Sequence, residues 1–378
     1  SEEIKLNEDV RENNRKFSLI GEAWYSHKWN DAYSLSAGYQ MEAYRLHSEV
    51  DNTFGYNKFN TDFLQNYVYA ELAGRHGKLG YMLSLGATQK RTSSVLDSYS
   101  TLLFRPSLTV QYNMTSNQQL RLQFDRQGLE PTISELSNNK KYIIDGIISE
   151  GNPYLRNATR NRVTLYYGGQ LSWLAGNVRP HFSHVQSPLN RYYSYSESEN
   201  TIVRQTENSL RSNTYGVSYD VRITPFPNNL LSASISGSVN QVHVKSKTVG
   251  TVRHLETPFY YRIDLAWKKW SASYYAVIVS TYLEGSHVRT VENVSYAHLA
   301  YRGKNWTATA QCYWPFSRSK YHNYTIDQSI VKNDAWTRIN DDASMVVLGF
   351  TLYLSKGDKR NAVRQIIQNS DTQSGSYY

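Results

Sequence analysis

The sequence predicts an all-β, antiparallel transmembrane β-barrel, with about 15 strands in this chain. Three observations predict it. Apolar residues recur at every second position over long stretches, short and long connections alternate between these stretches, and tryptophans gather near the short connections. Composition agrees with strands: 32 of the 378 residues are tyrosine, whose ring covers a pleated apolar surface while its hydroxyl stays hydrated.

The alternation is clearest in five stretches. Apolar side chains occupy every second position of residues 33–43, 79–87, 215–223, 231–239 and 346–354, and small or polar residues fill most positions between them. A helix would scatter these apolar side chains around its axis, whereas a strand gathers them on one face. Each face is about 9 to 11 residues long, which is the length that a tilted strand needs to cross a bilayer.

The connections between the strands fall into two classes. Short ones, rich in Gly, Asn, Asp and Pro, are predicted as tight turns at 29–31, 75–78, 115–117, 174–177, 225–229, 268–269 and 302–305. Longer polar ones are predicted as loops at 50–60, 127–157, 287–293 and 318–342. Short turns at one rim and long loops at the other are typical of a barrel with a periplasmic and an extracellular end.

Five tryptophans lie within a few residues of the predicted short turns. Indole rings favour the membrane interface, where the apolar ring and the N–H donor are both satisfied. We therefore predict as membrane-interface anchors Trp29, Trp173, Trp267, Trp270 and Trp306. Trp24, Trp314 and Trp336 do not follow this rule, so the alternative is that tryptophans fill core corners near turns.

Alternation by itself also fits a soluble barrel or sandwich, whose apolar side is buried. Long strands, few charges on the apolar face and long loops at one rim favour the membrane barrel, whose apolar side faces lipid and whose polar side lines a wet lumen. We divide the chain into a polar N-terminal segment (1–14), barrel strands and loops (15–356) and a polar C-terminal tail (357–378). The chain begins without a signal-like pattern, so we expect a mature product or a fragment.

Composition excludes several other classes of protein. The apolar runs, such as residues 274–279, are too short for a membrane-spanning helix, and Cys312 is the single cysteine, so an internal disulfide is excluded. The formal charge is +9, but the basic residues are scattered, so we expect no nucleic-acid partner.

Motifs that carry chemistry are absent from the sequence. It has no Gly-x-Ser-x-Gly elbow, P-loop or dinucleotide fingerprint, and His181 and His184, three apart on a strand, point to opposite faces. We therefore expect no enzyme, cofactor or metal site. A hydrolase at the extracellular rim is a less favoured alternative, for which Ser134, His254 and Asp327 are available by position only.

A predicted strand at 120–127 leads into residues 129–136, and a long loop ends at residues 150–157. This stretch resembles the "RxxxRPS…L" strand followed by "GNPxLKPE" in barrels of TonB-dependent receptors of the Bacteroidetes type, an outer-membrane β-barrel family. The corresponding positions are Arg126, Pro131, Ile133, Leu136, Gly151, Asn152, Pro153 and Leu155, while Arg156-Asn157-Ala158 replaces the usual Lys-Pro-Glu. Residues 348–354 also resemble the last strand of this family.

The resemblance implies a bacterial outer-membrane receptor whose 22-stranded barrel closes around an N-terminal plug contacted by TonB. Nothing in the chain resembles a plug, and an odd strand count does not close a bacterial barrel, so we expect the C-terminal portion of such a receptor. Its partners would be lipid, TonB, and a plug and first strands on a missing or separate segment. A surface lipoprotein partner stays open. Alternatively, a hairpin around residues 191–207 is miscounted and the barrel is smaller and complete.

The implied function is TonB-energised uptake of a nutrient through a polar lumen, with a passive porin-like channel as the alternative. The candidate lumen wall consists of Arg105, Arg121, Arg222, Arg262, Tyr67 and Tyr69, with Gln111, Lys268 and Tyr166 beside them. The aromatic residues could stack on sugars or other flat solutes.

Overall fold

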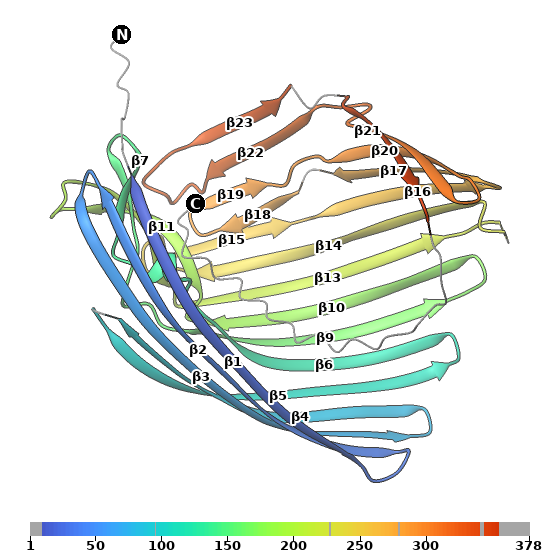
Figure 1. The fold of residues 1–378 in the computed structure, drawn as a ribbon, viewed down its shortest axis with the longest axis horizontal. Helices are drawn as coiled ribbons and strands as arrows, with labels where there is room; N and C mark the ends of the chain where they lie inside the picture. The colour runs from blue at the N-terminus through green and yellow to red at the C-terminus, as the bar shows by residue number, and fades with distance from the viewer. Residues whose placement is uncertain (1–9, 95, 227, 279, 341–343, 355–378) are drawn as a thin grey trace.

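The computed structural model describes residues 10–94, 96–226, 228–278, 280–340 and 344–354. Most of them belong to one curved antiparallel sheet, here called the barrel sheet (Figure 1). Its path runs through β1 (Arg11–Lys28), β2 (Tyr33–Asn52), β3 (Gly55–His76), β4 (Leu79–Ser94), β5 (Ser98–Thr115), β6 (Gln118–Leu129), β9 (Ala158–Gln170), β10 (Leu174–Gln186), β13 (Arg211–Ile223), β14 (Leu231–Lys245), β16 (Phe259–Trp267), β17 (Trp270–Ile278), β20 (Ser295–Arg302), β21 (Trp306–Tyr313) and β24 (Val346–Leu352).

This path confirms the predicted all-β antiparallel barrel wall and its strand count. β15 (Thr251–Glu256) pairs with β14 beyond the start of β16. Within the described residues, β1 and β24 are the two edges of the sheet. β1 begins at Arg11 rather than at residue 15, and the predicted tail 357–378 lies outside the described residues.

The short turns lie at one end of the barrel sheet and the long loops at the other (Figure 1). One predicted turn is displaced: residues 174–177 belong to β10, and the turn lies at 171–173. The prediction of a long loop at 50–60 is wrong, because β2 and β3 stay paired as far as Asn52 and Gly55 and leave only a tight turn between them. Backbone pairing and the burial of Phe59 extend these two strands.

The other long loops carry their own structure. One loop sheet has the order β11 (Leu189–Ser196), β12 (Thr201–Asn208), β8 (Ile147–Glu150) and β7 (Lys140–Ile144). The other has the order β18 (Thr281–Glu284), β19 (His287–Thr290), β22 (Ser319–Thr325) and β23 (Asp334–Ile339). The hairpin at 191–207 is therefore real but lies outside the barrel sheet. No helix in the described ranges has the length and apolar character to cross a membrane.

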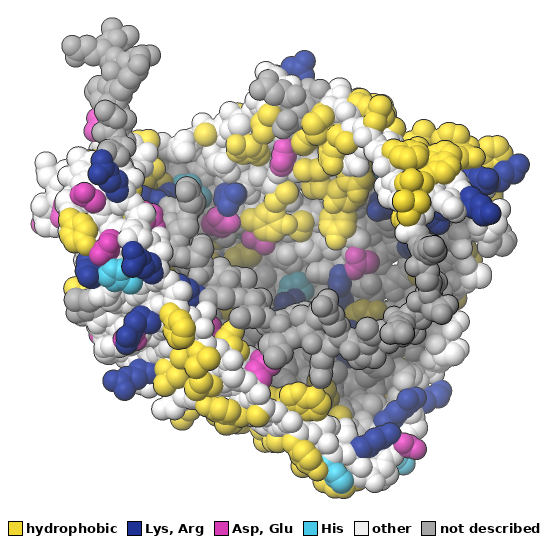
Figure 2. Space-filling model, viewed as in Figure 1, with side chains coloured by type: hydrophobic (Ala, Val, Ile, Leu, Met, Phe, Trp, Pro, Cys, Tyr) yellow, Lys and Arg dark blue, Asp and Glu magenta, His cyan; other side chains and the backbone are white. Residues whose placement is uncertain are grey.

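Apolar side chains on the barrel strands lie at the surface rather than in a core. Along β6, Leu120 and Leu122 are 36% and 42% exposed, whereas the alternating Arg121 and Gln123 on the other face are half-buried. Figure 2 shows hydrophobic side chains gathered over the rims around a hollowed centre. The apolar faces thus point outward, as the membrane interpretation requires and the soluble one does not.

A small core at the loop end explains the motif that carries the family resemblance. Ile133 and Leu136 of the short helix α1 (Ile133–Leu136) pack with Leu155 against Leu46 and Phe59 of β2 and β3, and all five are buried. The motif therefore folds the loop back onto the barrel sheet.

The end of this motif starts the next barrel strand despite the replaced Lys-Pro-Glu. Ala158 is the first residue of β9. Arg156 anchors this end of the loop, since its Nη1 lies 2.6 Å from Asp97 Oδ2 and its guanidinium lies 4.6 Å from the centroid of the Tyr99 ring.

Tyrosine rings on the inner face of the sheet lie over glycines of neighbouring strands. Tyr69 of β3 is directly opposite Gly38 of β2, and Tyr67 covers Gly86 of β4. A Cβ atom on Gly38 would lie 2.6 Å from Cζ of Tyr69, and one on Gly86 would lie 2.7 Å from Cε2 of Tyr67. Glycine therefore makes room for each ring to lie flat on the sheet.

Replacing Gly38 with alanine should lower the free energy of unfolding by about 1–3 kcal/mol, because the added methyl group overlaps the Tyr69 ring. Gly21→Ala on β1 is the matched control, since a Cβ there would meet no atom within 4 Å. Urea unfolding in lipid vesicles compares the two variants. Equal unfolding midpoints would show that the Tyr69 ring moves aside without cost.

Candidate functional site

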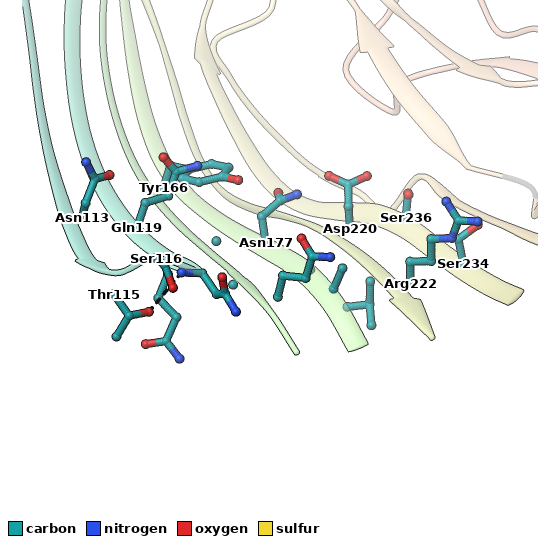
Figure 3. Close-up of a pocket in the computed structure, with 18 of the residues that line it drawn as sticks. Asn113, Thr115, Ser116, Gln119, Tyr166, Asn177, Asp220, Arg222, Ser234 and Ser236 are labelled. Atoms are coloured by element: carbon teal, nitrogen blue, oxygen red, sulfur yellow. Dashed lines mark hydrogen bonds between the residues drawn. The ribbon is translucent and has the colours of Figure 1, made fainter. Parts of the chain in front are cut away.

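A polar groove of about 890 Å³ lies on the inner face near the short turns (Figure 3). One row of its lining crosses three neighbouring strands, because Asp220 of β13 lies opposite Asn177 of β10 on one side and Ser236 of β14 on the other. Figure 3 shows these three side chains and Tyr166 pointing to the same side of the sheet. The groove thus presents amide, hydroxyl and carboxylate groups to its hollow.

Charges on this wall are paired within the wall itself. Arg179 donates a hydrogen bond to Asp220, and Arg262 Nε lies 2.8 Å from Asp264 Oδ1 on the same strand. Arg222 lies two residues after Asp220 on the same face of β13, and its Nη2 donates a hydrogen bond to Ser232 Oγ at 3.2 Å. Such exposed pairs add little stability, and their main effect is to keep the wall hydrated.

Two sets of stacked aromatic and guanidinium groups lie on the same inner face. The ring centroids of Tyr67 and Tyr69 are 5.4 Å apart, and the Arg105 guanidinium lies 4.5 Å from the centroid of Tyr67. The Arg121 guanidinium lies 4.9 Å from the centroid of Tyr166, its partner across β6 and β9. Each set presents a flat, partly cationic surface toward the hollow.

The six predicted wall residues thus form separate groups rather than one site. Tyr67, Tyr69 and Arg105 form one group, Arg121 joins Tyr166, Arg222 lines the groove, and Arg262 pairs along β16. Their role in passage of a solute stays a prediction. Lys268 does not lie on the wall: it occupies the turn after β16, and its Nζ lies 5.0 Å from the ring centroid of Trp267.

The five predicted anchor tryptophans all lie at the short-turn end. Trp29 and Trp173 occupy turns, and Trp267, Trp270 and Trp306 lie at strand ends. Trp270 and Trp306 each contact the ring of Tyr301, with centroids 4.8 and 5.3 Å apart. Their position fits an aromatic belt, and contact with lipid headgroups stays a prediction.

The serine and the histidine that a rim hydrolase would need have other hydrogen-bond partners. His254 Nε2 lies 2.9 Å from Thr281 Oγ1, Ser134 Oγ lies 3.1 Å from Thr132 Oγ1, and the backbone oxygen of Asp327 accepts from Lys332. Within the described ranges, no three His, Cys, Asp or Glu side chains are grouped to hold a metal ion.

A second polar region lies where the two loop sheets meet, and no sequence pattern predicted it. The tip of the β18–β19 hairpin docks on β11: Ser286 N–H donates to Arg191 O at 2.8 Å, and the Tyr193 hydroxyl lies 3.1 Å from His287 Nε2. Gly285, with φ +62°, allows this approach, because a Cβ there would overlap the Arg191 backbone. Only the long-range packing of loops brings these residues together, so no local pattern could have identified them.

Glu207 ties the first loop sheet to the barrel sheet. Its Oε1 accepts from Ser209 Oγ and Ser246 Oγ, both at 2.7 Å, and its Oε2 accepts from Thr248 Oγ1 at 2.6 Å. Burial acts to raise the pKa of this carboxyl, but these bonds and the Lys247 N–H outweigh burial and lower the pKa. The first loop sheet is therefore held against the end of β14.

Solved structures with this fold include transporters. The chain matches the copper transporter OprC (TM-score 0.65, 11% identity, 87% of this chain and 56% of that one) and the ferric citrate transporter FecA (0.63, 10%, 92% and 55%). It also matches the FrpB iron transporter from Neisseria meningitidis (0.61, 11%, 89% and 55%). The chain thus spans about half the length of each, and at these identities the likeness concerns the fold alone.

Sequence comparison gives the family. No curated protein matches the chain. A model of the outer membrane protein beta-barrel family matches residues 78–346, more than half of the chain, which confirms the outer-membrane β-barrel family that the motif around Gly151 suggested. The chain therefore belongs to the outer membrane protein β-barrel family, and its barrel sheet lies in the bacterial outer membrane.

Proposed function

We propose that the chain forms part of the barrel wall of a TonB-energised transporter that takes up a nutrient through a polar lumen. The inner groove carries the proposal, because its row of Asn177, Asp220 and Ser236 lies behind an outward apolar face. A wall that is apolar toward lipid and polar toward its hollow suits passage of a hydrated solute. The copper and iron transporters that share the fold support this proposal.

The wall residues have distinct tasks in this proposal. Tyr67 and Tyr69 with Arg105 offer a stacking surface for a planar solute. The polar side chains of the groove keep the part of the lumen near the short turns hydrated. The tryptophans at the short-turn end hold the barrel at the height of the periplasmic interface. No covalent step is assigned to any residue.

Other parts of the transporter would complete the wall. An open sheet edge in lipid leaves backbone N–H and C=O groups without partners, at a cost of several kcal/mol for each group. We therefore propose that further strands pair with the β1 and β24 edges, and that a plug contacted by TonB closes the lumen. A passive porin-like channel would instead need a closed sheet and no plug.

Conductance separates these two functions. The native protein, purified from the outer membrane and inserted into a planar bilayer, should show no steady open conductance, because the plug fills the lumen. It should also bind the periplasmic domain of TonB in solution. A steady conductance step on each insertion, without binding to TonB, would refute energised transport and establish the porin.

A further inference from the structure

The groove between the two loop sheets has a volume of about 630 Å³, within the range of small-ligand sites. Its walls come from both sheets: Arg191 and Arg204 from β11 and β12, and His287 and Arg289 from β19. These four basic groups face two carboxylates of the same lining, Glu135 and Glu284. The balance of charge depends on which of them are already paired.

Both carboxylates already have partners within the protein. Glu284 Oε2 lies 3.4 Å from Arg289 Nη1, so this pair cancels. Glu135 caps its own helix: its Oε2 accepts from the Thr132 N–H at 2.8 Å, and its Oε1 accepts from Thr206 Oγ1 at 3.2 Å. In the described part of the chain, neither Arg191 nor Arg204 has an ion-pair partner. Two guanidinium groups without an ion-pair partner are therefore left facing the groove, and with Glu135 still negative the lining carries a net charge of about +1.

Arg204 is the more constrained of the two. Its Nε is shielded from water and has no hydrogen-bond partner among the described residues. Burial lowers the pKa of Arg204, and repulsion from Arg191 lowers it further. Burial and the same arginines lower the pKa of His287, which leaves the imidazole largely neutral at pH 7. A shielded donor beside a second, uncompensated guanidinium favours an anion.

A neighbouring groove of about 530 Å³ shares the two arginines. Lys140 and Lys141 of β7 also line it, and so do Glu12, Glu135 and Glu150, so its lining is of mixed charge. Lys140 Nζ lies 2.6 Å from Glu199 Oε1, so it is already paired. The two arginines thus lie between both grooves and can be reached from either side.

We propose that Arg191 and Arg204 form an extracellular binding site for a small solute that carries a carboxylate or phosphate group. A planar guanidinium binds either oxyanion through two parallel N–H···O bonds. The site rests on the proposed uptake function, since it names the class of solute that the loops capture before passage. Capture here places the solute at the loop end of the wall that leads to the inner groove.

Three sugars that share the glucose ring test the site by calorimetry on the native protein in detergent. Glucuronate carries a carboxylate, glucose 6-phosphate carries a phosphate, and glucose carries neither. We expect at least one of the two anions to bind at least tenfold more tightly than glucose, with an affinity that falls as salt rises. The oxyanion that binds more tightly identifies the preferred group.

Charge-removing variants assign the binding to these arginines. Arg191→Gln should weaken anion binding at least tenfold, and it should not disturb folding because the side chain is exposed. Arg204→Gln should do the same or more. Arg253→Gln on β15 is the matched control, since Arg253 is exposed and lines neither groove. It should bind like the unaltered chain.

Two results would overturn the site. One is equal affinity for glucose and both anions, or no binding at millimolar concentration. The other is equal anion affinity of the Arg191→Gln and Arg253→Gln variants. The calorimetry needs neither a membrane nor TonB, so anion binding stands even if the conductance experiment establishes a porin. Lost binding likewise leaves energised transport of another solute intact.

Discussion

Gly151→Ala is expected to destabilise the loop core by about 3 kcal/mol, at the upper end of the cost of overpacking. A Cβ atom at Gly151 would overlap the carbonyl oxygen of Ser137 and lie 2.9 Å from that of Ser134. Both are backbone atoms at α1, which is closed on its other side by Leu46 and Phe59. If the chain around residue 151 moved away to relieve this overlap, it would break the hydrogen bond from Asn152 N–H to Glu135 O, which is 2.5 Å long.

Hydrogen exchange in detergent measures this effect by segment. Gly151→Ala should speed exchange in residues 133–155 while leaving the short-turn end of β9 protected. Gly169→Ala is the control, because its Cβ would meet only ordinary contacts, the nearest at 3.6 Å. Unchanged exchange at 133–155 in the Gly151→Ala variant would contradict the tight packing described for this loop.

Leu122→Arg is the second substitution with a large expected effect. Leu122 lies in the middle of the outward row of β6, and its side chain is 42% exposed. A charged side chain on the lipid face near the bilayer midplane costs about 2–4 kcal/mol. The variant should therefore unfold at a lower urea concentration in lipid vesicles and insert less efficiently.

The neighbouring position supplies the control for that substitution. Gln123 lies one residue further along β6, on the polar face. Gln123→Arg places the same charge against the wet side of the wall and should cost less than about 1 kcal/mol. If the two arginines cost the same, the two faces of β6 have the same surroundings and the lipid-facing assignment fails.

Periodicity predicted most of the wall because a strand has only two faces. Along β13 and β14, each apolar residue and its polar neighbour were assigned to opposite sides without any knowledge of pairing. Turn composition located most of the short-turn end, because Gly, Asn and Pro adopt backbone conformations that other residues avoid. The turn at 171–173 was displaced because Gly176 and Asn177, which suggested it, lie within β10.

The loops could not be predicted in the same way. Polar residues such as Asn57 and Asn60 suggested a loop, yet β3 continues through them on backbone pairing and on the burial of Phe59. The proposed anion-binding site consists of Arg191 and Arg204, which line one groove with His287 only after the two loop sheets pack together. The family motif identified Leu155 and Gly151 by sequence, but their packing against β2 and β3 is a long-range contact.

Spin-label accessibility along β6 tests the central claim most directly. In a Cys312→Ser background, single nitroxide labels at positions 120 to 125 report contact with lipid-soluble oxygen and with a water-soluble nickel complex. In vesicles, labels at 120, 122 and 124 should contact oxygen, and those at 121, 123 and 125 should contact nickel, with a period of two residues. Labels at 120, 122 and 124 that contact neither reagent would show a dry core and contradict the membrane barrel.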